Sequence, residues 1–108
     1  MNYEEALALM KKAKNPSKGK PIANNTRLYV GFDGSFKIKL HGSTIITLYP
    51  NYIVLDSCGY RTRTTKDRMN QFTPFYVSQR NYKWYVNLTP PYGKKEPFHD
   101  GIKLEVKE

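Results

Sequence analysis

The segment Asp56-Ser-Cys-Gly-Tyr-Arg-Thr-Arg-Thr-Thr-Lys-Asp-Arg-Met-Asn70 marks the change from strands to helix in this chain of 108 residues. The sequence before it alternates at the period of strands, whereas the segment itself is rich in hydroxyl and guanidinium side chains. Thr64 followed by Asp67 matches the capping-box pattern. The sequence therefore predicts a short central helix over residues 64–72, with Thr64 as its N-cap.

Four strands are predicted before this segment, over residues 26–57, and short turns join them into an antiparallel meander. In the first hairpin, a two-residue Asp33-Gly34 loop would place lysines on the apolar face of the sheet. A three-residue Phe32-Asp33-Gly34 loop instead pairs Val30 with Phe36. This loop is the prediction, with Gly34 in a left-handed conformation. The last two strands are apolar on both faces, so they are expected in the middle of the sheet.

The flanking regions complete the predicted fold. Residues 1–14 have the spacing of an amphipathic helix, and residues 15–25 are predicted to be a polar connector. Residues 75–106 are expected to form a C-terminal hairpin turning near Arg80-Asn81, then a loop, then a closing strand. The prediction is one α+β domain spanning residues 1–108.

Charge is the strongest compositional signal. The chain has 18 Lys and Arg residues against 9 Asp and Glu, a net charge of +9, and the excess is concentrated in residues 57–85. Such an excess indicates a polyanionic partner, or else serves solubility alone. Cys58 is the only cysteine, so an intrachain disulfide is excluded. The sequence lacks an apolar run long enough for a membrane helix, and no membrane association is expected. A cytoplasmic location is predicted.

The predicted start of the central helix has the composition of an anion site. A helix N-terminus carries partial positive charge and free N–H donors, and guanidinium groups match phosphate oxygens. The expected anion or ligand contacts are Arg61, Arg63, Thr64, Thr65, Lys66 and Arg68, with His41 and Tyr60 beside them. The alternative is that the arginines pair with acidic side chains and the threonines only cap the helix.

Aromatic residues near basic ones form a second candidate site. Tyr82 and Tyr92 are predicted to be exposed stacking residues for a nucleobase, whereas Trp84 alternates with apolar neighbours and is expected in the core. Catalytic and metal-binding motifs are missing, because one cysteine and the distant His41 and His99 make no recognised pattern. No catalytic residue, metal or cofactor is predicted.

Several motifs together resemble a family of small uncharacterised proteins of tailed bacteriophages. These motifs are Asn25-Thr-Arg-Leu28, Asp33-Gly-Ser35, Lys39-Leu-His-Gly-Ser-Thr44 and the run from Gly59 to Asn70. The resemblance implies a phage gene, and small accessory phage proteins often act on host machinery or host defence by binding.

The expected function is therefore binding without catalysis. The leading hypothesis is a protein of the host cytoplasm that engages a phosphorylated ligand, either a nucleotide signal or a nucleic acid, and so inhibits host antiviral defence. The alternative is a protein-interaction module that docks on a host defence protein through its basic and aromatic surface.

Overall fold

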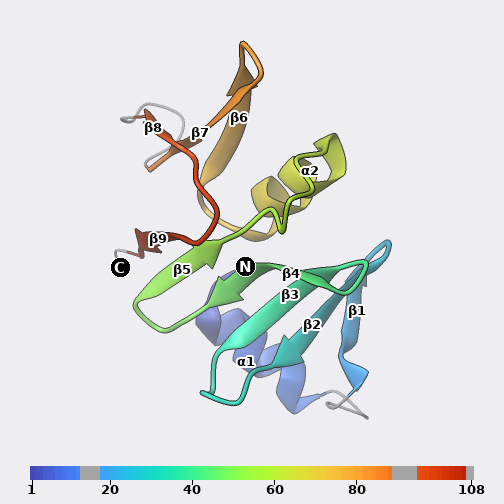
Figure 1. The fold of residues 1–108 in the computed structure, drawn as a ribbon. Coiled ribbons are helices and arrows are strands. Elements are labelled where there is room, and N and C mark those ends of the chain that lie inside the picture. Colours follow the sequence, from blue (N-terminus) through green and yellow to red (C-terminus); the bar gives the residue numbers. More distant parts are fainter. Residues whose placement is uncertain (13–17, 89–94, 107–108) are drawn as a thin grey trace.

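A six-stranded antiparallel sheet forms the larger part of this computed structural model, which describes residues 1–12, 18–88 and 95–106 (Figure 1). The strand order is β1-β2-β3-β4-β5-β9, and β6, β7 and β8 form a second sheet. The elements are α1 (Tyr3–Lys11), β1 (Lys20–Ala23), β2 (Thr26–Val30), β3 (Phe36–Leu40), β4 (Ser43–Leu48), β5 (Tyr52–Leu55), α2 (Arg63–Phe72), β6 (Tyr76–Arg80), β7 (Lys83–Asn87), β8 (Lys95–Pro97) and β9 (Ile102–Glu105). The α+β class is confirmed.

The predicted meander is confirmed as β2 to β5, with the last two of these strands inside the sheet. Val30 pairs with Phe36, and Gly34 has φ +81°, as the three-residue loop requires. The connector predicted over residues 15–25 was wrong in part, because β1 pairs with β2 as an edge strand. The strand was not predicted because it contains Pro21, and proline is unfavourable in strands except at the edge of a sheet.

A row of aliphatic side chains crosses the sheet and forms its core. The register aligns Leu28, Ile38, Ile46, Leu55 and Ile102 on neighbouring strands, and all of them are buried. Helix α1 packs against β2 and β3 (Figure 1). The sheet is therefore apolar on the helix side, while the other side carries mainly basic and polar side chains, among them Arg27, Lys37, Lys39 and Thr47.

A bulge in β4 brings the side chain of Ile45 to the start of α2. Ile38 pairs with Ile46, but the next residue, Lys39, pairs with Thr44, so Ile45 is an extra residue in β4. Because a bulge interrupts the alternation of side chains, Ile45 and Ile46 are both buried although they are adjacent. Ile45 consequently faces the start of α2 and lines a pocket there.

The second sheet projects away from the first (Figure 1). The predicted hairpin is present as β6 and β7, with Asn81 and Tyr82 as its two turn residues. Helix α2 packs against β6 and β4 and so connects the two sheets. Strand β8 lies within the stretch expected to be a loop, and it pairs with β7. Its sequence, Lys-Glu-Pro, has no apolar alternation that could have predicted a strand.

Candidate functional site

The N-cap of helix α2 lies two residues earlier than its sequence suggested. Thr62, not Thr64, is the N-cap: its Oγ1 accepts a hydrogen bond from the Thr65 amide at 3.2 Å. The capping-box prediction was wrong: Thr64 lies inside the first turn, and the buried face of the helix is Thr65, Met69 and Phe72. Thr65 is only 1% exposed, and its hydroxyl lies 3.1 Å from that of Thr62.

Asp67 therefore has a different role from the one predicted. Its carboxylate lies 3.8 Å from the Arg63 guanidinium, one helical turn away, and both side chains are exposed. An exposed pair of this kind contributes little to stability. The start of α2 carries no acidic residue in its first turn, so its partial positive charge is not offset there.

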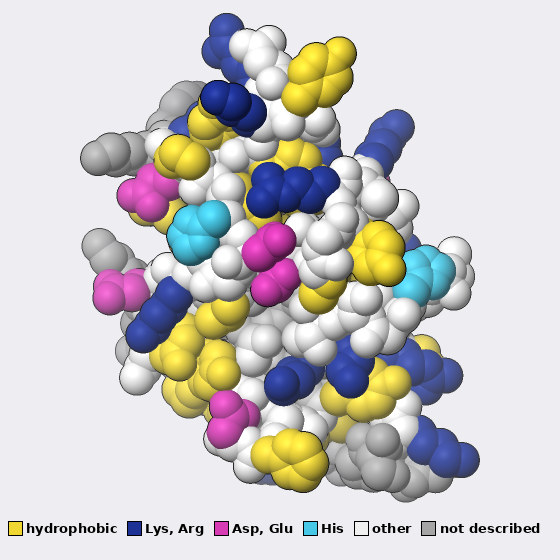
Figure 2. Space-filling model, in the orientation of Figure 1, with side chains coloured by type: hydrophobic (Ala, Val, Ile, Leu, Met, Phe, Trp, Pro, Cys, Tyr) yellow, Lys and Arg dark blue, Asp and Glu magenta, His cyan; other side chains and the backbone are white. Residues whose placement is uncertain are grey.

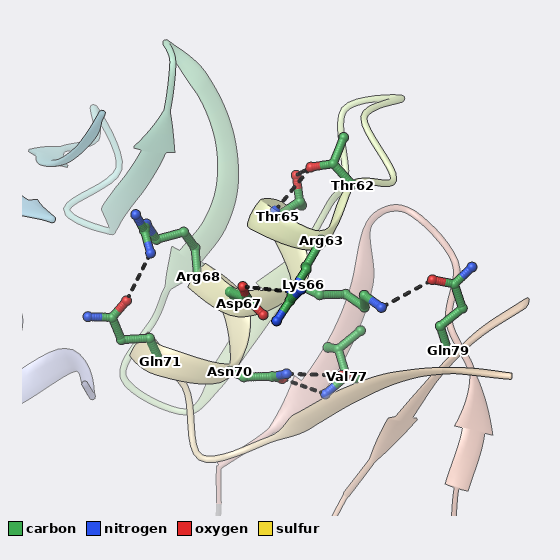
Figure 3. Close-up of polar contacts among 10 residues, drawn as sticks. All are labelled: Thr62, Arg63, Thr65, Lys66, Asp67, Arg68, Asn70, Gln71, Val77 and Gln79. Atoms are coloured by element: carbon green, nitrogen blue, oxygen red, sulfur yellow. Dashed lines mark hydrogen bonds and ion pairs between the residues drawn. The ribbon is translucent and has the colours of Figure 1, made fainter. Parts of the chain in front are cut away.

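The cations predicted to converge on an anion point in different directions (Figure 3). The Lys66 ammonium donates to Gln79 Oε1 on β6, at 3.1 Å. Arg68 extends the other way: its Nε donates to Thr26 Oγ1 at 3.0 Å. Arg61 and Arg63 do not share one side with Thr65, because both arginines are exposed whereas Thr65 lies on the buried face of the helix.

The side chain of Arg61 extends toward the second sheet. Its guanidinium carbon lies 5.5 Å from the ring centre of Trp84 and 5.2 Å from that of Phe98. These distances are within the range of cation–π contacts. Tyr60 and Thr62, the neighbours of Arg61, line a pocket on the other side, so the extended segment alternates between two hollows.

That pocket has a volume of about 430 Å³ and lies between the start of α2 and the turn after β3. Leu40 and Ile45 supply apolar lining. Its polar lining consists of His41, Ser43, Ser57, Thr62, Thr64 and Thr65, with Tyr60 at its rim. Four predicted contacts (His41, Tyr60, Thr64 and Thr65) thus meet, whereas its lining among the described residues contains no lysine or arginine.

Two tight turns position the rim of the pocket. His41 has φ +52° and Gly42 φ +86°, and the pair joins β3 to β4. Cys58 (φ +53°) and Gly59 (φ +80°) form a similar turn, closed by the Tyr60 amide donating to the Ser57 carbonyl at 2.8 Å. These left-handed positions aim His41 and Tyr60 at the same pocket from two different loops.

Ser57 joins the pocket wall to the loop before β9. Its amide and its hydroxyl both donate to Asp100 Oδ1, at 2.8 and 2.6 Å. Burial tends to raise the pKa of Asp100, but the two Ser57 hydrogen bonds and the charge of Arg61 outweigh it, so that this pKa lies below its ordinary value. Asp100 is therefore a structural carboxylate that stays ionised.

The second hollow contains one predicted stacking residue. It has a volume of about 280 Å³, and Tyr82, Arg61, Lys83, Trp84 and Phe98 are among its lining residues. Trp84 is buried, as expected, whereas Tyr82 is 95% exposed. Tyr92 lies outside the described residues.

The histidines and the cysteine weighed as catalytic candidates lie on different turns. The two histidine side chains lie apart on the face in Figure 2, one on the turn after β3 and one beside Asp100. Burial, and then the charges of Asp56 and Asp100, raise the pKa of Cys58, which keeps its thiol protonated. The described chain also contains no group of three residues suited to a metal ion, nor a helix long and apolar enough to cross a membrane.

Sequence reasoning missed Thr62, Ser43 and Ser57 in the pocket. Thr62 had a weak local signal, because a threonine is a favoured N-cap and Thr62 precedes Thr65 by three residues, but Thr64 before Asp67 offered the same spacing. Ser43 and Ser57 carried no local signal. They meet only because β4 and β5 are paired neighbours in the sheet.

Comparison with known protein families identifies the family of the chain. The family model described as Kyanoviridae Gp96 protein matches residues 4–105. The chain belongs to this family. The match confirms the expected relation to small tailed-bacteriophage proteins, and it covers the sheet, α2 and the β6–β7 hairpin alike. No curated protein and no solved structure matches the chain.

Proposed function

We propose that this phage protein binds a small phosphorylated ligand of the nucleotide type in the pocket at the start of α2. The observation that supports the proposal is the meeting of His41, Tyr60, Thr64 and Thr65, from two loops and a helix, in one concave site of about 430 Å³. Pockets for small molecules are usually clefts of about 300–1,000 Å³ with apolar walls and a few convergent polar groups. This pocket has that size and that composition.

The start of α2 provides the phosphate end of the site. The first amides of a helix have no partner inside the helix, and their dipoles favour an anion. Thr64 is exposed in the first turn and lines the pocket. Arg63 precedes Thr64 but does not line the pocket; its side chain is 92% exposed, and its ion pair with Asp67, at 3.8 Å, is weak enough for the guanidinium to turn toward a bound phosphate.

The rim of the pocket suits the other end of a nucleotide. Tyr60 is 63% exposed, and its ring offers an aromatic face beside the apolar residues Leu40 and Ile45. His41 at the opposite rim adds a ring that both donates and accepts hydrogen bonds. In the host cytoplasm, a phage protein with such a site would sequester a nucleotide signal and thereby weaken antiviral defence.

A thermal-shift panel tests the proposal. It compares inorganic phosphate, nucleoside mono-, di- and triphosphates and cyclic dinucleotides, and the best compound is then measured by calorimetry. At least one nucleotide should raise the melting temperature, because a ligand that binds only the folded state stabilises it. The shift should persist at high salt, since a ligand held in a pocket is screened less than one on the surface.

Matched variants locate the site. Thr64→Ala, a change in the pocket lining, should weaken binding by about tenfold, the loss of one charge-assisted hydrogen bond. Lys37→Ala is the control, because Lys37 lies on β3 and does not line the pocket. If no phosphorylated compound shifts the melting temperature, or if the control loses as much affinity, the proposal is wrong. A protein partner would then be the remaining hypothesis.

A further inference from the structure

The tip of the β6–β7 hairpin has an unusual turn. Arg80 pairs with Lys83, and the two residues between them, Asn81 and Tyr82, have φ +52° and +65°. A two-residue turn with both central residues left-handed takes asparagine readily at the first position and strongly prefers glycine at the second. Tyrosine at the second position is strained, because its Cβ crowds the backbone.

Nothing in the described fold offsets this strain. The Tyr82 side chain is 95% exposed at the end of a hairpin that stands away from the rest of the molecule (Figure 1). A strained residue whose side chain packs on nothing is a reasonable starting point for a functional hypothesis. What Tyr82 contributes is an aromatic face presented to solvent.

The surroundings of that face are cationic and aromatic. Arg80 and Lys83 flank Tyr82 in the hairpin, and Figure 2 shows hydrophobic and basic side chains together at the top of the molecule. Below the tip lies the hollow of about 280 Å³, with Trp84 and the Arg61 guanidinium in its lining. Tyr82 therefore stands at the rim of a hollow whose lining joins a guanidinium to aromatic rings.

This combination restricts the partner. Exposed positive charge favours an anionic partner, and an exposed aromatic ring can stack on another flat ring. Single-stranded nucleic acid has both properties, since its phosphates meet lysine and arginine while its unpaired bases stack on aromatic rings. A duplex hides the faces of its bases, and an acidic peptide has no flat ring to offer as a rule.

We propose that the β6–β7 hairpin is a contact element for single-stranded nucleic acid, in which Tyr82 stacks on a base and Arg80, Lys83 and Arg61 contact neighbouring phosphates. The inference goes beyond the proposed nucleotide pocket and does not depend on it. Tyr60 and Thr62 line the pocket, whereas Arg61 between them lines the hollow under the hairpin.

Binding of a fluorescein-labelled 15-residue oligothymidylate, measured by anisotropy, tests the proposal. The logarithm of affinity should fall with the logarithm of salt concentration with a slope of about −2, for roughly three neutralised phosphates on a single strand. Emission of Trp84, the only tryptophan, should change on binding because its ring lines the hollow.

Tyr82→Gly is the decisive variant, because glycine suits the turn. It should raise the melting temperature while weakening oligonucleotide binding by at least about fivefold, the lower range for loss of one stacked base. Tyr82→Phe, which keeps the ring, should bind like the wild type. Lys83→Gln should reduce the magnitude of the salt slope by about 0.7, whereas Lys12→Gln, at the end of α1, is the charge-matched control and should leave the slope within error.

Three outcomes would overturn the proposal: wild-type affinity in Tyr82→Gly, equal competition by a duplex of the same length, or equal competition by polyglutamate. The last result would indicate attraction by charge alone. Thr64→Ala separates the two proposed sites, since it should weaken nucleotide binding in the pocket and leave oligothymidylate binding unchanged. The converse pattern is expected for Tyr82→Gly.

Discussion

Replacement of Asn70 by alanine should destabilise the fold more than any change at the surrounding surface of α2. The Asn70 side chain pairs with the backbone of Val77 on β6: Nδ2 donates to the Val77 carbonyl at 3.0 Å, and Oδ1 accepts from its amide at 2.6 Å (Figure 3). One amide side chain thus completes the free edge of β6 and fastens α2 to the second sheet.

The magnitude follows from burial. Each hydrogen bond contributes about 0.5–1.5 kcal/mol net, and a buried group left without a partner costs about 1–3 kcal/mol. Val77 is 1% exposed, so water reaches its orphaned amide and carbonyl only if α2 shifts. We expect Asn70→Ala to lose about 2–3 kcal/mol of unfolding free energy. At roughly 4 °C per kcal/mol for a chain of this size, the melting temperature should fall by about 8–12 °C.

Urea unfolding followed by Trp84 fluorescence measures this loss, because Trp84 is buried on β7 beside β6. Asn70→Asp keeps the acceptor and removes the donor, so its stability should lie between those of the wild type and Asn70→Ala. Gln71→Ala is the neighbouring control: Gln71 accepts only an exposed hydrogen bond from Arg68, and its loss should cost less than about 0.5 kcal/mol. If Asn70→Ala unfolds within that same margin of the wild type, the edge-pairing argument is refuted.

Three further predictions concern the helix cap, the first hairpin and acid stability. Thr62→Ala should cost about 1–2 kcal/mol in urea unfolding, whereas Thr64→Ala should cost less than about 0.5 kcal/mol; equal losses would contradict the observed cap. Gly34→Val should lower the unfolding free energy by about 1–2 kcal/mol, because φ +81° is strained for valine although the space around Gly34 is open; an unchanged value would exclude strain as the cause. The pKa of Asp100 is lowered in the folded protein, so its stabilising effect is fully present above the unfolded pKa of about 3.9 and is lost as pH falls through the folded pKa. The stability difference between the wild type and Asp100→Asn should therefore shrink toward zero in acid. A difference that does not depend on pH would contradict this.

The meander from β2 to β5 was predictable because its signals are local. Alternating apolar residues and the position of one glycine determine which residues pair in a hairpin, so the pairing of Val30 with Phe36 followed from the sequence. β8 was not predictable in the same way. Its residues carry no pattern of their own, and it forms a strand only because β7 presents an edge to pair with.

The candidate pocket shows the same division between local and tertiary information. The sequence by itself determined that hydroxyl and basic residues gather around the start of a helix, in residues 60–68, because helix-start patterns involve neighbours only a few positions apart. Which threonine caps the helix was visible only in the folded chain, where Thr62 and not Thr64 accepts the hydrogen bond from the Thr65 amide. Tertiary packing also decided that the cations diverge while His41 joins the threonines. These outcomes depend on contacts between residues tens of positions apart, such as Arg68 with Thr26, which only the folded chain brings together.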